Sequence, residues 1–447
     1  MKIYRDLYSF LLLILSVILI FYVFFKSEIY WNGDKREYYK IYYYLSTLFL
    51  LFSLSFFFIK KKIKIYLIIC FLSSIIALYS FEYFLINKDQ LILSKKEKIY
   101  FKETSKKFEK RNRIEIYNYY KNINKNMKIV ASPHYYLYKK NIDIFPLSGF
   151  SYAKTINCKE NGYYSIFESD RYGFNNPDDQ WDKDHLEYLL VGDSFAKGSC
   201  VNRPNDIASQ LRKLSNKTSI TVGYNSKGPL MELATLKEYI KPNVKNVVWL
   251  FFEGNDVYNL ENELNNKFLQ QYLVNIDFRQ NLVLKQKQID NLSELLISEV
   301  LKKKEKELQV TDSLSFKVIK FLKFYNLRKL LLNYESNSTY EYLLNKKTTN
   351  ALTKIFQSAK TVSATNNSKF YMVYLPSYER FTKKRNNLNY DIIKSIAKTN
   401  DINFIDINKE LFSKIQDPLI YFPFRSNGHY NEKGYFEIAK ILYRIIK

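Results

Sequence analysis

The chain has 447 residues, enough for more than one structural unit, and carries a formal net charge of +25 at pH 7. The basic residues are spread along the whole length among many Asn, Ile, Tyr and Phe residues, a pattern typical of a biased genome composition. The charge therefore gives no support to a nucleic-acid partner, although it suits an anionic glycan or lipid head group.

Three apolar stretches near the N-terminus predict a membrane unit over residues 1–90. Residues 7–25, 41–59 and 65–86 are each close to the ~20 apolar residues that a helix needs to cross a bilayer. No small-residue cleavage site follows the first stretch, so we interpret it as a transmembrane helix and not as a signal peptide.

The short loops predict how these helices are oriented. The turn at residues 60–64 carries four lysines, a strong cytoplasmic signal, whereas the loop at residues 26–40 mixes basic and acidic side chains. This predicts a multi-pass protein of the cytoplasmic (inner) membrane, with its N-terminus on the cytoplasmic side and everything after residue 86 outside the cytoplasm, as a periplasmic domain. The lysines that follow the third helix oppose this orientation.

Residues 91–184 are expected to form a linker and an extension that packs on the main domain. A polar, Lys-rich connection covers about residues 87–126, and a stretch with scattered Tyr, Pro and Gly follows to residue 181. No residue of the extension receives a chemical role of its own. Cys158 and Cys200 both fall in the predicted outer region, where a disulfide persists, and we predict that they pair. Two free thiols are the alternative.

Residues 185–447 show the alternation of an α/β domain. Short apolar runs at 188–191, 220–224, 247–252, 370–375 and 402–407 predict strands, and segments such as 205–214 and 230–240 predict helices between them. Fully apolar strands alternating with helices are typical of a parallel sheet covered on both faces. The alternation stops at about 257–345, where Leu, Lys and Glu at helical spacing predict a helical insertion.

Seven of the 11 glycines lie in or beside four short blocks, which indicates tight backbone turns at strand ends. They are Gly192, Gly198, Gly223, Gly228, Gly254, Gly428 and Gly434. Because ligands bind at the carboxyl ends of the strands in open α/β sheets, this placement predicts a site at that edge.

The first and last blocks carry a candidate nucleophile and a candidate base. Ser194 follows Gly192 and Asp193 directly after a strand, where a serine can project its hydroxyl above the sheet, with Asp193 as a supporting group. An Asp/Ser turn or helix cap is the simpler interpretation of this block alone. Of the three histidines, only His429 lies in a glycine-containing loop before a terminal helix, at 436–446.

The two middle blocks offer hydrogen-bond donors. Residues 223–228 follow a strand and precede a helix, so a backbone N–H there can face a substrate oxygen. Asn255, at the end of the strand 247–252, can offer its side-chain N–H, although an Asx-turn is a structural alternative. Preorganised donors of this kind are worth roughly 2.7–4 kcal/mol each in a transition state.

In this order the blocks resemble the four signatures of the SGNH/GDSL hydrolase family, over about residues 186–447 apart from the insertion. The matching segments are Gly192-Asp193-Ser194, residues 223–228, Gly254-Asn255-Asp256 and His429. The resemblance implies a flavodoxin-like, three-layer α/β/α domain. It also implies that Ser194 is the nucleophile and a backbone donor, that Asn255 is an oxyanion donor and that His429 is the general base.

Two positions depart from the family pattern. The second-block donor is usually a glycine; counting from Gly223 selects Gly228, whereas aligning Gly-Pro-Leu selects Ser226, and either backbone N–H can serve. The family usually has Asp three residues before the His, where this chain has Ser426. His429 could be oriented by Ser426, by a backbone carbonyl or by a distant acid, with Ser194 and His429 acting as a dyad.

The sequence thus predicts a membrane-anchored serine esterase or O-acyltransferase that works through an acyl-serine intermediate without a cofactor. No Cys/His spacing suggests a metal site. The expected partners are the lipid bilayer, an acylated cell-envelope or exported glycan, and a membrane protein that supplies the acyl donor. The alternative is a non-catalytic glycan-binding or scaffold protein that retains the fold, which the missing Asp favours.

Overall fold

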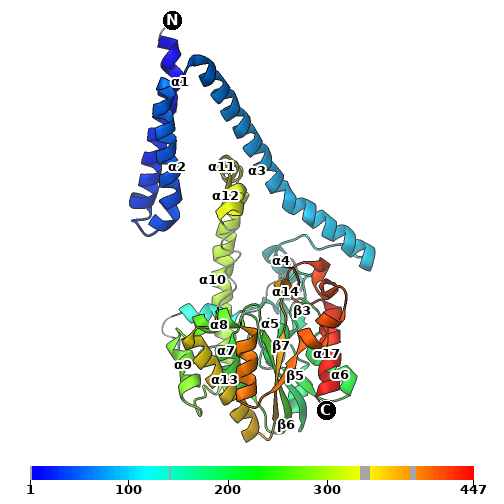
Figure 1. Ribbon diagram of the computed structural model, residues 1–447. Coiled ribbons are helices and arrows are strands. Elements are labelled where there is room, and N and C mark those ends of the chain that lie inside the picture. The colour runs from blue at the N-terminus through cyan, green and yellow to red at the C-terminus, as the bar shows by residue number, and fades with distance from the viewer. Residues whose placement is uncertain (1–2, 140–141, 333–342, 383–388, 447) are drawn as a thin grey trace. The chain divides into compact units, whose positions relative to one another are not determined.

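The computed structural model describes residues 3–139, 142–332, 343–382 and 389–446. The chain divides into two compact units (Figure 1). The first consists of Met1–Lys88 and Lys320–Leu327, and the second of Asp89–Ile319 and Arg328–Lys447. The chain therefore passes between the units more than once.

Three helices that begin in the first unit are long and apolar enough to cross a membrane, and the third continues into the second unit. They comprise α1 (Ile3–Phe24) with the π-helical segment η1 (Phe25–Tyr30), α2 (Arg36–Ser55) with the 3-10 turn η2 (Phe56–Phe58), and α3 (Lys61–Thr104). Most of their large apolar side chains are exposed, as expected for helices whose solvent is lipid.

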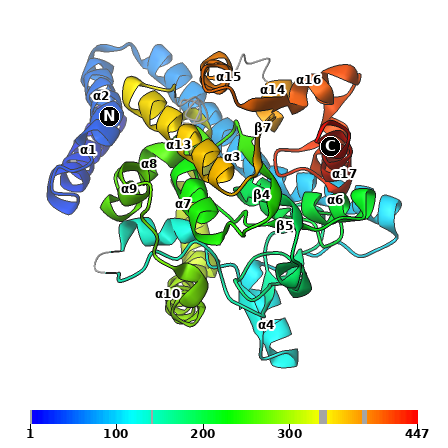
Figure 2. The same cartoon turned by 90° about the horizontal axis from the view of Figure 1, so that it is seen from below.

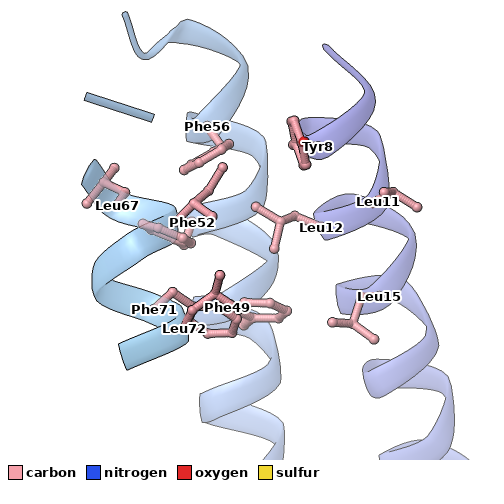
Figure 3. Close-up of a pocket in the computed structure, with 11 residues that line it drawn as sticks. Tyr8, Leu11, Leu12, Leu15, Phe49, Phe52, Phe56, Leu67, Phe71 and Leu72 are labelled. Atoms are coloured by element: carbon pink, nitrogen blue, oxygen red, sulfur yellow. The ribbon is translucent and has the colours of Figure 1, made fainter. Parts of the chain in front are cut away.

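Polar contacts join these helices at several points, among them the ion pair of Arg36 in α2 with Glu28 in η1. The Ser16 and Ser53 hydroxyls lie 3.0 Å apart between α1 and α2, and Lys64 Nζ donates to Ser9 Oγ at 3.1 Å. An apolar pocket of about 200 Å³ lies between the three helices (Figure 3), lined for example by Leu12 of α1. The apolar lining suits a membrane environment.

The third helix is longer than the sequence indicated. The expected apolar helix ended at residue 86, but α3 continues to Thr104, and α4 (Arg113–Ile123) occupies much of the expected connection. Hydropathy falls after residue 86, whereas the following Lys, Leu, Glu and Gln residues keep good helix propensity. Asn112 then starts α4 through a capping box with Glu115.

The second unit is built on a five-stranded parallel sheet of order β5-β4-β6-β7-β8. Its strands are β4 (Leu186–Gly192), β5 (Ser219–Thr221), β6 (Val244–Phe252), β7 (Lys369–Leu375) and β8 (Asn403–Asp406). Each corresponds to one of the predicted apolar runs, although β5 ends at Thr221 and the residues to Tyr224 form a loop. The mixed α/β architecture with a parallel sheet is thereby confirmed.

Helices cover both faces of this sheet (Figure 2). Leu189 and Val191 of β4 pack into a core shared with α7 and α13, whereas Tyr188 and Leu190 pack into a second core shared with α6 and α17. The covering helices are α6 (Ile207–Ser215), α7 (Pro229–Tyr239), α13 (Lys346–Thr365), α15 (Tyr390–Thr399) and α17 (Glu432–Ile445). Burial on both faces explains why the strands are apolar without alternation.

The extension forms a small sheet of its own. Strand β1 (Met127–Ile129) pairs in parallel with β2 (Lys154–Ile156), which pairs antiparallel with β3 (Ile166–Glu168). The 3-10 helices η3 (Pro133–Tyr138) and η4 (Asp178–Asp182) flank it. Its apolar side chains join the core that contains α7 and α13, so the extension packs on the main domain.

The segment expected to be an insertion is mostly helical over its described residues, and residues 333–342 lie outside them. It contains α8 (Asp256–Glu263), α9 (Lys267–Val274), η5 (Leu282–Leu284), α10 (Gln286–Asp312), α11 (Leu314–Leu322) and α12 (Tyr325–Leu332). Short helices complete the fold near the C-terminus: α14 (Tyr378–Thr382), α16 (Ile407–Glu410), η7 (Phe412–Lys414), η8 (Pro418–Tyr421) and η9 (Pro423–Arg425).

Candidate active site

Ser194 begins the four-residue helix α5 (Ser194–Lys197) directly after β4. Asp193 caps this helix, since its Oδ1 accepts the Phe195 N–H at 2.8 Å. Gly192 has a φ of +150°, and a Cβ there would lie 2.7 Å from the Leu250 carbonyl oxygen. The tight turn therefore needs glycine, and it places the Ser194 hydroxyl at the carboxyl edge of the sheet.

His429 lies in the loop between η9 and α17, and its Nε2 is 2.8 Å from Ser194 Oγ. The Phe195 ring packs beside the imidazole, with 4.8 Å between the ring centroids. The structure thus brings the two expected catalytic side chains into hydrogen-bond contact from positions 235 residues apart.

The acid beside His429 is Glu160, from the extension. Its Oε1 and Oε2 lie 3.0 and 3.1 Å from His429 Nδ1, and the His429 backbone N–H donates to Oε2 at 2.6 Å. A Cβ at Gly428 would lie 2.5 Å from Glu160 Oε2, so glycine at this position lets the carboxylate approach. The extension, to which the sequence assigned no chemical role, therefore places a carboxylate against His429.

Ser426 does not take the place of the family's Asp. Its hydroxyl donates to the Phe424 carbonyl oxygen at 3.2 Å, within its own loop. Of the alternatives left open by the sequence, a distant acid is the one found. Ser194, His429 and Glu160 form a continuous hydrogen-bonded chain.

Glu160 and His429 shift each other's pKa. Burial favours neutral Glu160, but the charge of His429 and its hydrogen bonds outweigh burial and lower the Glu160 pKa. Burial likewise opposes protonation of His429, yet the Glu160 charge and hydrogen bond raise its pKa. A carboxylate only accepts hydrogen bonds, so it favours the tautomer with the proton on Nδ1. Nε2 then faces Ser194 as the acceptor.

A disulfide between Cys158 and Cys200 ties the Glu160 segment to the chain that follows α5. Cys200 Sγ lies 3.4 Å from His429 Nδ1, and Asn161 Nδ2 donates to the Cys200 carbonyl oxygen at 2.9 Å. Glu160 is two residues from Cys158, so the bridge holds it near the nucleophile. The two sulfurs and His429 are close enough to share a metal ion, but bonded sulfurs offer no thiolate ligands.

Asn255 lies on the other side of the serine. Its Nδ2 is 3.4 Å from Asp193 Oδ2, and Ser194 Oγ is 3.3 Å from the same oxygen. Burial raises the pKa of Asp193. The Asn255 amide donor and the Ser194 hydroxyl are thus brought together around one buried carboxyl group.

The two candidate donors of the second block differ in their surroundings. The Gly228 N–H donates to the buried Glu263 carboxyl group at 2.5 Å, as do the Leu230 and Met231 N–H groups at 2.9 and 3.3 Å. Ser226 is exposed and has a φ of +58°. Since Glu263 occupies the Gly228 N–H, the expectation that it faces a substrate oxygen disagrees with this structure.

A buried lysine fixes the second-block loop. Lys197 Nζ donates to Asn225 Oδ1 at 2.6 Å, and Asn225 Nδ2 donates to Asn157 Oδ1 at 3.2 Å. Burial lowers the Lys197 pKa well below its usual value. Its ammonium-bearing end lies over the rings of Phe167 and Tyr224, at 4.3 and 4.8 Å from their centroids. This network links α5 to the strand region just before Glu160.

A cavity of about 700 Å³ opens beside this network. Its lining includes apolar side chains of α10 as well as amides and hydroxyls such as Asn157, Asn225 and Ser226. Arg113 and Lys304 also line it. Because Asn157 lies three residues before Glu160, the cavity adjoins the segment that carries Glu160.

Sequence reasoning missed Glu160 and Lys197. Glu160 belongs to no recognisable motif, but the predicted pairing of Cys158 with Cys200 contained a usable signal. Cys200 is six residues beyond Ser194 and Glu160 is two beyond Cys158, so the pairing brings an acid near the nucleophile. Lys197 gave no signal, because an isolated lysine after a serine turn is normally solvated.

Comparisons with known proteins add little to this description. No protein-family model and no curated protein sequence matches the chain. Among solved structures, one from Desulfitobacterium hafniense DCB-2, assigned by its description to the lipolytic proteins of the G-D-S-L family, aligns with 58% of this chain and 99% of its own, at 11% identity and a TM-score of 0.29. At that level of similarity the site must be interpreted from its own geometry.

Proposed function

We propose that the protein is a membrane-anchored serine esterase or O-acyltransferase of the SGNH type, with Ser194, His429 and Glu160 as its catalytic residues. The observation that carries the proposal is the hydrogen-bonded chain from Ser194 Oγ through His429 to Glu160. In the five-stranded sheet the strand order is β5-β4-β6-β7-β8, so the second strand along the chain lies at the edge, beside the first. This order, with helices on both faces, supports a flavodoxin-like, three-layer domain.

The reaction follows from the roles of these groups. Ser194 Oγ attacks the ester carbonyl carbon while its proton passes to His429 Nε2, and Glu160 stabilises the resulting imidazolium. The tetrahedral intermediate expels the alcohol, which takes the proton from Nε2, and leaves an acyl-serine. Water or a sugar hydroxyl then gives its proton to Nε2 and attacks the acyl carbon. The second tetrahedral intermediate expels Ser194 Oγ, which takes that proton back from Nε2.

Three donors are suited to the negative oxygen of the tetrahedral intermediate. We assign the Ser194 backbone N–H, the Asn255 side-chain N–H and the Ser226 backbone N–H to this role, with Ser226 in place of Gly228. Asn255 now contacts Asp193 at 3.4 Å, a long hydrogen bond that a charged oxygen can replace. Removing one such donor from a serine hydrolase typically costs about 10²–10³-fold in kcat.

The substrate we propose is an O-acylated cell-envelope or exported glycan. Amides, hydroxyls, two tyrosines and apolar α10 side chains line the cavity beside the site, a combination that suits both the hydroxyls and the C–H faces of sugars. We further propose that the catalytic domain lies on the periplasmic side of the cytoplasmic membrane, and that a membrane partner supplies the acyl donor if the enzyme is a transferase.

Labelling with a fluorophosphonate tests the catalytic assignment. The full-length chain is purified in detergent, treated with the probe and digested, and the adduct is located by peptide mass spectrometry. We expect one adduct, on Ser194, that is absent from Ser194→Ala and strongly slowed in His429→Ala. Ser199→Ala is the matched control, because Ser199 is a buried serine in the same region and its loss should leave labelling intact.

Two outcomes contradict the proposal. Equal labelling of the wild type and Ser194→Ala would show that the reactive group lies elsewhere. No labelling of a folded wild-type chain would favour the non-catalytic glycan-binding protein. The feature that favoured that alternative was the missing Asp at position 426, and Glu160 now supplies the carboxylate that it lacked.

A further inference from the structure

Helices α11 and α12, here called the tip helices, expose large apolar side chains. Seven of these side chains are between 40% and 78% exposed: Leu314, Val318, Ile319, Leu322, Tyr325, Leu330 and Leu331. None of the seven belongs to either hydrophobic core of the described residues. Contiguous apolar surface of this kind marks a contact with a protein, a ligand or a membrane.

The basic residues of α11 are confined to one side. Lys317 and Lys320 are three residues apart and so lie on the same side of the helix, whereas Leu314, Val318 and Phe321 follow the i, i+4, i+7 pattern of an apolar side. A helix with a wide apolar face and a narrow lysine stripe is typical of an element lying in the interface of an anionic membrane.

The chain between the tip helices contacts α3 within the first compact unit. The Tyr79 ring of α3 lies 4.2 Å from the Phe324 ring and 5.2 Å from the Phe321 ring, measured between centroids. The Tyr79 hydroxyl donates to the Leu322 carbonyl oxygen at 3.2 Å. Residues Lys320–Leu327 are thus attached to the last apolar turns of a predicted transmembrane helix.

Glu82, one turn after Tyr79, caps the start of α12. Its Oε1 accepts the Asn326 backbone and side-chain N–H groups, both at 2.9 Å, and its Oε2 accepts the Leu327 N–H at 2.8 Å. The side chain is fully buried. A carboxylate in an apolar helix is costly in a membrane unless it is satisfied, and here a helix N-terminus satisfies it.

We propose that the tip helices are inserted into the bilayer beside α3, with their apolar sides against lipid chains and the α11 lysines at anionic head groups. Glu82 lies four residues before residue 86, where the apolar stretch ends, or about 6 Å along the helix axis. The contact therefore falls near the boundary between lipid chains and head groups, where an amphipathic helix is stable.

The surroundings of the tip helices favour lipid as the contact of their apolar side chains. The α3 residues around the contact are themselves exposed and apolar, for example Phe81, Phe84 and Ile86. The same chain passes from the second unit at Ile319 and returns at Arg328. The catalytic unit is thereby tied to the membrane by two separate segments, α3 and the tip helices.

Depth-dependent fluorescence quenching tests this proposal. A Cys70→Ser chain removes the free thiol, and single cysteines are placed at Ile319 or Leu331, labelled with an environment-sensitive fluorophore and reconstituted in phosphatidylcholine/phosphatidylglycerol vesicles. We expect nitroxides on the lipid acyl chains to quench most of the emission at both positions. The matched control is Leu284→Cys, which is 87% exposed and apolar but outside the tip helices; it should stay unquenched.

Substitution of Glu82 tests the attachment. Glu82→Ala leaves the N-terminus of α12 without its acceptor, so quenching at Leu331 should fall, while Glu82→Gln, which keeps one acceptor oxygen, should retain part of it. Quenching at Ile319 and Leu331 no greater than at Leu284 would overturn the proposal. If the Glu82→Ala chain fails to insert into the membrane, the comparison of Ile319, Leu331 and Leu284 in the chain with native Glu82 still tests the proposal.

Discussion

Glu160 holds His429 at two points, the backbone N–H and Nδ1, so one carboxylate fixes both the loop and the imidazole ring. A carboxylate three residues before the His would sit in the same loop. Glu160 instead comes from 269 residues earlier in the chain. The orientation of the His429 ring therefore depends on how the extension packs, and not only on the C-terminal loop.

Replacing Glu160 with Gln should impair catalysis while leaving the fold intact. Gln keeps the size and hydrogen-bonding ability of the side chain but removes the negative charge that stabilises the imidazolium. We expect kcat to fall by about 10²–10⁴-fold, the usual contribution of a positioned acid–base group. Ester hydrolysis and the rate of fluorophosphonate labelling measure the effect. Glu379→Gln is the control, since Glu379 contacts Asn427 in the same loop without touching His429.

The same variant has a signature in the pH profile. His429 must be neutral to accept the Ser194 proton, and Glu160 raises its pKa above the usual 6.5, so wild-type activity should rise with pH through that higher value. Without the Glu160 charge, burial dominates and lowers the His429 pKa. The midpoint of the rise should therefore move to lower pH in Glu160→Gln. An unchanged midpoint would show that Glu160 has no electrostatic role.

Residues with a local pattern could be predicted from the sequence, and those without one could not. Ser194, Asn255 and His429 each follow a strand or precede a helix within a glycine-containing block, so their place at the sheet edge follows from the fold. Glu160 lies in no such block, and only tertiary packing brings it to His429. The donor of the second block was also undecidable, because Glu263, which engages Gly228, lies in the insertion.

At the scale of elements, the same distinction applies. The apolar strands and the helices between them could be read from hydropathy, because burial on both faces leaves few polar positions. The length of α3 could not, since a helix continues wherever propensity and backbone hydrogen bonds allow, regardless of where hydropathy falls. The sheet of β1, β2 and β3 was missed because three-residue strands are too short to show a period.

The Cys158–Cys200 disulfide joins two elements of the site, so breaking it should affect stability and activity together. Removing a native disulfide typically costs about 2–4 kcal/mol of unfolding free energy. In the Cys158→Ser/Cys200→Ser chain we also expect slower ester hydrolysis, because the segment carrying Glu160 loses its tether. Thermal unfolding and turnover, with and without reductant, measure both effects.

The third cysteine provides the control for that experiment. Cys70 is a free thiol in α3, so Cys70→Ser should behave as the wild type and should remain sensitive to reductant. A doubly substituted chain with wild-type turnover would contradict a positioning role for the bridge. Loss of stability with full activity would restrict the disulfide to a structural role.

At the scale of the whole molecule, two independent features indicate on which side of the membrane the catalytic unit lies. The lysine cluster at residues 60–64 favours a cytoplasmic loop between α2 and α3, which sends the end of α3 outward. The disulfide favours the same side, because structural disulfides persist outside the reducing cytoplasm. An acyl-transfer site there would meet envelope or exported glycans.

Cysteine accessibility tests this orientation in intact cells. In the Cys70→Ser background, a membrane-impermeant maleimide should label Asp401→Cys from outside, because the Asp401 side chain is fully exposed in the catalytic unit. Lys62→Cys, in the loop between α2 and α3, should react only after permeabilisation. The reverse pattern would place the catalytic unit in the cytoplasm, where neither the bridge nor an exported glycan is expected, and both the location and the substrate class would have to be abandoned together.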